Sequence, residues 1–227
     1  MPSRPSYQVR FGLRTLFLVL TIIAACAIWY GRYASDYRRE AELMRRLAGK
    51  HTLNAETRYF GPTLLRPLLQ HTMSFHRVIT VSIEGDYIDD QDLREISSFQ
   101  CLADLSVSSR GVAPHGLTQL TSCPLLASLE FDGAKVTGET VQALSGCRAL
   151  RYLWFDSCEI SETAIDRLAT FDGLVELGMI DCDIPFLAVR RLGKCKSLRQ
   201  LDVRFCDLPQ SQIEALLMLR PELQVLR

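Results

Sequence analysis

The chain of 227 residues has a single asparagine, Asn54, and no net charge, because 26 basic residues balance 26 acidic ones. Its four histidines are scattered, and none stands beside a candidate nucleophile. It has no Gly-x-Ser-x-Gly motif, no His-Glu-x-x-His motif and no glycine-rich dinucleotide motif. These absences argue against an enzyme, so we expect no catalytic residue, no bound cofactor or metal, and no nucleic-acid partner.

Charge is distributed unevenly along this otherwise ordinary globular composition, in which 48% of residues are hydrophobic and 23% are charged. Residues 1–77 hold twelve Lys or Arg against four acids, whereas residues 78–227 hold fourteen against twenty-two. A basic segment is suited to an anionic membrane surface. The two parts are therefore expected to have different neighbours.

A long uncharged run follows the basic N-terminal tail, residues 1–10. Residues 16–29 carry no charge, and residues 11–30 carry only Arg14. Twenty helical residues rise about 30 Å, the thickness of one hydrocarbon core. Trp29, Tyr30 and Tyr33 would form an aromatic belt at one end. The pattern predicts a single-pass transmembrane helix over 11–30 in the cell membrane, with the lipid bilayer as a partner.

Two other interpretations of this run involve processing. A cleaved signal peptide would also have arginines before an apolar core, and Ile23-Ala24-Ala25-Cys26 is similar to a lipoprotein signal in which Cys26 is acylated. The apolar run continues beyond Cys26, which favours an uncleaved signal anchor. Arginines flank the run on both sides, so the side of the membrane that carries the rest of the chain stays open.

Residues 31–50 are rich in helix formers and are expected to extend the helix as a basic juxtamembrane stem that ends near Gly49. The stem would contact anionic lipid, pair with a second copy, or serve as a solvated spacer with i,i+4 charge pairs, and we favour the spacer. Residues 51–77 contain a short apolar helix around residues 64–69. They are expected to cap the region that follows.

From Val78 onward, six columns of apolar residues return every twenty-four residues. Each copy opens with alternating apolar residues, typical of a strand, and continues with apolar residues three apart, typical of a helix. Asp89, Thr137 and Ser161 stand where these helices would begin, as N-caps. A single copy cannot bury its apolar edge, so the copies must stack. The six copies begin at Val78, Leu102, Leu126, Leu150, Leu174 and Leu198.

The pattern Leu-x-x-Leu-x-Val/Phe, followed at position +10 by Ile or Val in five copies and by Leu208 in the last, resembles the leucine-rich repeat over residues 78–227. The whole layout is similar to short bacterial leucine-rich-repeat proteins with an N-terminal membrane anchor. The resemblance implies an α/β solenoid, a right-handed curved superhelix with a parallel sheet on its concave side that binds other proteins. Position +8, usually Asn in the family, partly follows the cysteine-containing subtype: Asp86, Arg110, Ala134, Cys158, Cys182 and Cys206.

The eight cysteines recur in columns, six of them at positions +8 and +21 of the copies. Cysteine in a repeat column behaves as a small buried hydrophobic residue. A disulfide ladder or a metal site are the alternatives, but no Cys-x-x-Cys spacing and no accompanying His pair occur. Free buried thiols are therefore expected.

Side chains at positions +2, +4 and +6 of each copy should point outward from the sheet. Tyr152 and Trp154 stand mid-array, and an exposed aromatic pair within a polar rim is typical of an interface hot spot. The acids around them are Glu130, Asp132, Asp156 and Glu176. This arrangement predicts a membrane-anchored, non-catalytic module that binds a protein partner, with the acids favouring a basic one.

Two other functions remain open. The acidic face would also suit a regulatory or inhibitory subunit that occupies the basic active site of an enzyme. A structural cell-envelope component would instead assemble through the ends of the solenoid. Residues 223–226 form a last, incomplete strand, whose edge would be open to pairing.

Overall fold

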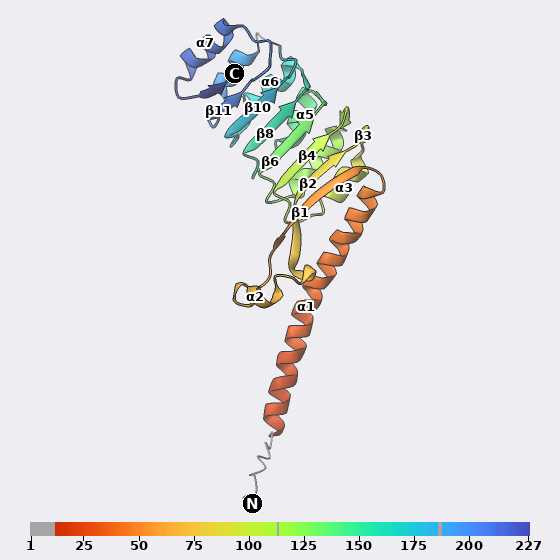
Figure 1. Ribbon diagram of the computed structural model, residues 1–227. Coiled ribbons are helices and arrows are strands. Elements are labelled where there is room, and N and C mark those ends of the chain that lie inside the picture. Colours follow the sequence, from red (N-terminus) through yellow and green to blue (C-terminus); the bar gives the residue numbers. More distant parts are fainter. Residues whose placement is uncertain (1–11, 113, 186–187) are drawn as a thin grey trace, which may run out of the picture.

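The computed structural model describes residues 12–112, 114–185 and 188–227. A single long helix leads from the N-terminal side into a stack of strands (Figure 1). This helix, α1 (Leu13–Ala48), has 36 residues and a length of about 54 Å. One 18-residue window has a mean hydropathy of 2.0 and none of it is buried, so α1 is long and apolar enough to cross a membrane. The helix ends where the sequence predicts, with Gly49 as its C-cap.

One eight-stranded sheet runs through the rest of the chain, and all neighbouring strands in it are parallel except β1 and β2. Leu105, Leu129, Leu153 and Leu177 are paired across successive strands. The 24-residue period therefore corresponds to one strand per copy. In sheet order the strands are β1 (Thr52–Tyr59), β2 (His76–Glu84), β4 (Asp104–Ser108), β6 (Ser128–Asp132), β8 (Tyr152–Asp156), β10 (Glu176–Ile180), β11 (Gln200–Asp202) and β12 (Gln224–Leu226).

Two short ladders follow the main strands where the chain turns towards the helices. One pairs β3 (Tyr87–Ile88) with β5 (Gly111–Val112), and the other pairs β7 (Lys135–Val136) with β9 (Glu159–Ile160). Ile88, Val136 and Ile160 occupy position +10 and are buried. The side chains at position +10 therefore form the part of the hydrophobic core that lies beneath these turns.

Helical segments form the second layer, one for each copy (Figure 1). Asp89, Thr137 and Ser161 are the N-caps predicted from the sequence, each accepting a backbone N–H from three residues on. Pro209 offers no such side-chain bond. The segments are α3 (Asp90–Ile96), α4 (Pro114–Leu117) with the 3₁₀ helix η3 (Thr118–Ser122), α5 (Gly138–Leu144), α6 (Glu162–Leu168), the 3₁₀ helix η4 (Val189–Lys194) and α7 (Gln210–Leu219).

The apolar columns meet in one continuous core between the sheet and the helices. Phe131 and Phe155, at the same position of adjacent copies, stack with ring centroids 5.9 Å apart and planes inclined by 13°. Burial of each such side chain stabilises the fold by about 2 kcal/mol. Each copy thus completes the interior of its neighbour, as the repeat requires.

Cysteines at position +8 tie each copy to the one before it. The Cys158 thiol donates to the Phe131 carbonyl at 3.4 Å, and the Cys206 thiol donates to the Met179 carbonyl at 2.8 Å. In the second copy, buried Ser109 donates instead to the Asp86 carbonyl at 3.3 Å. All eight cysteines lie in the described residues and are unpaired there.

The first edge of the sheet is closed by β1, which pairs antiparallel with β2 and places Leu53 and Ala55 against the core. The sequence did not predict this strand. The short apolar helix expected around residues 64–69 is present beyond it. It consists of η1 (Thr63–Leu65) and α2 (Arg66–Leu69), followed by η2 (Met73–Phe75).

The stem half of α1 packs against this first edge instead of standing free in solvent. Leu47 is buried in the core, and the carboxylate of buried Glu40 accepts the Val78 N–H at 3.1 Å. Arg77 donates to the Tyr33 carbonyl at 3.2 Å and to Asp36 at 3.3 Å. The stem is therefore not a solvated spacer, because long-range contacts fix one of its faces, although the expected i,i+4 charge pair is present between Glu42 and Arg46 at 3.2 Å.

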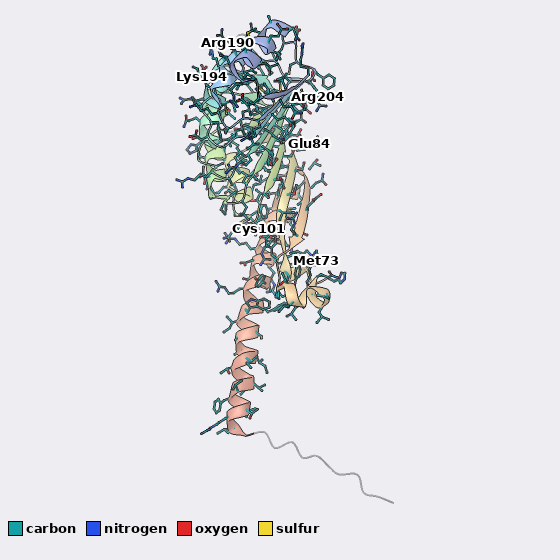
Figure 2. All side chains as sticks on the ribbon, turned by 90° about the vertical axis from the view of Figure 1, so that its left-hand side faces the viewer. Met73, Glu84, Cys101, Arg190, Lys194 and Arg204 are labelled. Carbon is teal, nitrogen blue, oxygen red and sulfur yellow. The ribbon has the colours of Figure 1, made fainter. Side chains whose placement is uncertain are left out.

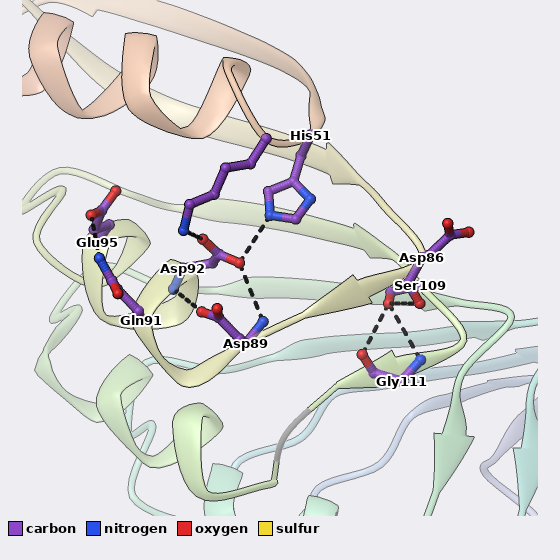
Figure 3. A network of polar contacts seen from close by, with 9 residues as sticks. His51, Asp86, Asp89, Gln91, Asp92, Glu95, Ser109 and Gly111 are labelled. Carbon is purple, nitrogen blue, oxygen red and sulfur yellow. Dashed lines mark hydrogen bonds and ion pairs between the residues drawn. The ribbon is translucent and has the colours of Figure 1, made fainter.

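A buried carboxylate holds the end of the stem to α3 (Figure 3). Asp92 accepts a hydrogen bond from Lys50 at 2.8 Å, and its other oxygen lies 2.9 Å from His51 Nε2. Asp89 and Asp92 form a reciprocal capping box at the start of α3. Helix α1 and the first repeat are thus joined rigidly.

Candidate interaction surface

The structure brings the six predicted contact residues together on three adjacent strands, β6, β8 and β10. Tyr152 lies between Ser128 and Glu176, and Trp154 lies between Glu130 and Gly178. Their outward positions alternate with buried ones, as a strand requires. We call the six residues the β6–β8–β10 surface: Glu130, Asp132, Tyr152, Trp154, Asp156 and Glu176.

Trp154 owes its position to a glycine on the next strand. A Cβ atom built on Gly178 would lie 2.0 Å from Cε3 of the Trp154 ring, so the indole occupies the space that any other side chain would need. Gly178 is buried beneath it. Sequence reasoning did not single out Gly178, although it is the only glycine at position +4 of the six copies.

The four acids surround the aromatic pair without a cation of their own. Glu130 is exposed, Tyr152 is 38% exposed, and the other acids are half-buried. Asp132 accepts a hydrogen bond from Ser108 at 2.8 Å. Within the described residues, none of the four carboxylates belongs to an ion pair. The surface therefore presents uncompensated negative charge around two aromatic rings.

The acidic surface ends at β11, where Asp202 differs from its predicted outward placement. Asp202 is 1% exposed, and Arg204 covers it with hydrogen bonds of 2.7 and 3.0 Å. Burial opposes ionisation of this carboxyl, but the bonds from Arg204 hold its pKa below the usual range. The negative charge of Asp202 is thus neutralised by Arg204.

Two hollows lie beside other elements. A groove of about 1290 Å³ on the helical side is lined by residues of η3, α5 and α6. A hollow of about 520 Å³ lies beside Lys50 and His51 and reaches Asp132 at the border of the β6–β8–β10 surface. Among the described residues, no group of three His, Cys, Asp or Glu side chains is arranged to hold a metal ion. The β6–β8–β10 surface remains the strongest candidate, since it combines aromatic area with charge.

Comparison with protein-family models finds no match, and comparison with curated proteins finds none either. A leucine-rich repeat protein of Leptospira interrogans is similar to the chain at 17% identity and a TM-score of 0.42, over 58% of this chain and 33% of that one. An internalin of Listeria monocytogenes is similar at 18% identity and a TM-score of 0.42, over 67% of this chain and 45% of that one. The chain thus spans less than half the length of either protein.

The chain has a leucine-rich-repeat-like α/β fold. Three features support this description. They are the 24-residue period of the sequence, a mostly parallel sheet that gains one strand with each copy, and a helical segment behind each strand.

Proposed function

We propose that the protein is a single-pass membrane-anchored, non-catalytic module that binds a basic protein partner on the concave face of its solenoid. The carrying observation is the Tyr152–Trp154 pair, placed among four carboxylates that have no ion-pair partner in the described residues. Aromatic anchors inside a polar rim supply much of the binding energy at protein interfaces. Uncompensated acids draw in a basic partner and repel nucleic acid.

The anchor is supported by the continuity of α1, whose apolar half runs without a break into the docked stem. This continuity favours an uncleaved anchor over a cleaved or acylated one. Trp29 marks the end of the apolar half, and Leu47 lies in the core. Leu47 follows Trp29 by eighteen positions, a helical rise of about 27 Å. The stem would hold the β6–β8–β10 surface at a fixed distance from the bilayer.

Photo-crosslinking in the native membrane tests this proposal. A photoreactive phenylalanine analogue is placed at Tyr152 of the full-length chain, and a matched control carries it at Gln142, which is on the helical side. We expect a discrete crosslinked protein from position 152 only. Trp154→Ala should weaken that contact by about 2 kcal/mol without a large change in thermal stability. Equal crosslinking from both positions, or no effect of Trp154→Ala, would remove the surface from consideration.

The identity of the crosslinked protein separates this function from the regulatory alternative. An enzyme captured through its active site would make the chain an inhibitory or regulatory subunit that uses the same surface. Assembly through the solenoid ends is less favoured, because the last strand, β12, has three residues and short edge strands pair poorly with other chains.

A further inference from the structure

The segment between β1 and β2 carries large apolar side chains that no part of the described protein covers. We call residues 60–75 the lobe. Its base is closed by a hydrogen bond from the Phe60 N–H to the Phe75 carbonyl at 2.8 Å. Leu64 is 94% exposed, Leu68 is 78% exposed and Met73 is 53% exposed. Leu64 and Leu68 are four residues apart and share one side of the η1–α2 turn.

The lobe is fixed against α1 at the level where the apolar half of the helix ends. Phe75 is 1% exposed, and its ring centroid lies 5.5 Å from that of Trp29 and 5.2 Å from that of Tyr33. The hydroxyls of Tyr30 and Ser74 are 3.3 Å apart. In Figure 1, α2 lies beside the middle of α1, and Figure 2 shows Met73 in this lobe, far from the other end of the solenoid.

The charge of the lobe and its flanks has one sign. Residues 57–83 contain no Asp or Glu, and both Arg58 and Arg66 are exposed. An apolar tip next to arginine is the composition of segments that lie in the interface of an anionic bilayer. If Trp29 and Tyr30 stand at that interface as an aromatic belt, the packing of Phe75 brings Leu64 and Leu68 to the same depth.

We propose that the lobe inserts Leu64, Leu65, Leu68 and Met73 into the interfacial region of the bilayer that α1 spans. This inference rests on the proposed membrane anchor. A helix alone would leave the solenoid free to tilt against the bilayer in any direction. A second contact on one side of α1 fixes this tilt and, with it, the inclination of the β6–β8–β10 surface to the membrane plane. Lipid is the occupant because the tip is continuous with the membrane-facing part of α1.

Quenching of tryptophan fluorescence by brominated lipid tests the proposal on the full chain. The chain is reconstituted in vesicles of phosphatidylcholine and phosphatidylglycerol, brominated high on the acyl chains. Trp154→Phe leaves Trp29 as the only tryptophan and reports on the anchor. Adding Trp29→Phe and Leu68→Trp reports on the lobe. The matched control carries Phe205→Trp instead, at a side chain that is 80% exposed near the far end of the solenoid.

We expect Leu68→Trp to lose emission as Trp29 does, and Phe205→Trp to keep its emission. Quenching of Trp29 without quenching at position 68 would overturn the lobe contact and leave the anchor intact. No quenching of either would overturn the anchor itself, and the lobe contact with it. A blue-shifted but unquenched Leu68→Trp would mean that protein, either a second copy or a partner, covers the tip, which also overturns the proposal.

Discussion

The indole of Trp154 lies across the backbone of Gly178 on the neighbouring strand, in the space where a Cβ atom would come within 2.0 Å of Cε3. The two residues fit each other in shape. The absence of a side chain at Gly178 of β10 lets the ring lie along the sheet, and the ring in turn covers the glycine backbone, which is buried. A change at either residue should therefore alter the geometry of the other.

Gly178→Ala should displace the Trp154 ring and weaken partner binding about as much as Trp154→Ala, by about 2 kcal/mol. The ring is the part that moves, so the fold should keep nearly the same melting temperature. The emission maximum of Trp154, measured in a Trp29→Phe background, should shift as the ring becomes more exposed. Ser106→Ala, at the same position on β4 and away from the ring, is the control. An unchanged emission maximum together with unchanged binding would contradict the role of Gly178.

The repeated part of the fold was predictable because its elements follow from residue types at short spacings, and the same spacings return in every copy. The strand that opens each of the six copies, and the caps at Asp89, Thr137 and Ser161, follow from residue types at fixed positions. The six contact residues were also predictable as neighbours, because an unbroken period sets the register. Their role as a binding surface stays a prediction.

The parts that were not predictable depend on contacts between distant segments. Strand β1 lies outside the period and forms because β2 offers an unpaired edge. Glu40 is a charged residue on an apparently solvated helix, yet it is buried because the Val78 N–H needs an acceptor. Asp202 occupies an outward position, yet it is buried because Arg204 folds over it. Local residue spacing predicts none of these three outcomes.

The junction between α1 and the first repeat should make stability depend on pH. Burial disfavours the Asp92 carboxylate, but hydrogen bonds from Lys50 and His51 more than offset this, and the pKa of Asp92 lies below its ordinary value of 3.8. A carboxyl whose pKa is lowered by folding stabilises the protein above its unfolded pKa, and this stabilisation is lost as pH falls through the folded pKa. The free energy of unfolding should therefore decline as pH drops below about 4.

Asp92→Asn should lower the free energy of unfolding by about 1.5 kcal/mol at neutral pH, because His51 loses a charge-assisted hydrogen bond in a shielded site, while Lys50 is half-exposed and remains solvated. The decline of stability in acid should become shallower in the same variant. Urea unfolding of the full chain in detergent, at several pH values, measures both effects. Asp207→Asn, at an exposed carboxyl, is the control. Parallel pH curves for Asp92→Asn and the wild type would contradict the linkage.

Position +7 of four copies turns through the left-handed region, with φ of 68° at Gly133, 49° at Ser157, 50° at Asp181 and 63° at Phe205. Only Gly133 is a residue type that adopts this region without strain. Its added Cβ would meet nothing within 4 Å, so Gly133→Ala tests backbone strain alone and should destabilise the fold by about 1 kcal/mol.

The converse change is Phe205→Gly. The side chain is 80% exposed, so little burial is lost, and release of the left-handed strain should outweigh the added freedom of the unfolded chain by about 0.5 kcal/mol. Thermal unfolding of both variants measures the two effects. A Gly133→Ala variant as stable as the wild type would show that the turn relaxes out of the left-handed region.

The cysteines should differ sharply in reactivity, because the thiolate is the form that reacts with alkylating reagents. Burial raises the pKa of the Cys123 and Cys147 thiols to about 11. At neutral pH these groups are almost entirely protonated as well as shielded from solvent. Cys158, Cys182 and Cys195 are also buried, whereas Cys101 and Cys206 are half-buried.

The reactivity of Cys26 tests whether α1 lies in a membrane, whereas the reactivity of the other cysteines tests the packing of the repeats. It is exposed on α1, so a water-soluble maleimide should reach it when the chain is held in a dispersed state. In vesicles, a helix that spans the bilayer hides Cys26 in the hydrocarbon core, and only Cys101 and Cys206 should react, slowly. Rapid modification of Cys26 in intact vesicles would mean that this part of α1 lies in water.

Unfolding in denaturant without a reductant should then expose every thiol, and mass spectrometry of the alkylated chain should count eight modifications. The reason is that each repeat thiol is held only by packing and by weak bonds to backbone carbonyls, as Cys206 is to Met179, and unfolding removes both. A count of two or none would require disulfides between the stacked columns, and the cysteines would then link the copies covalently instead of only filling the core between them.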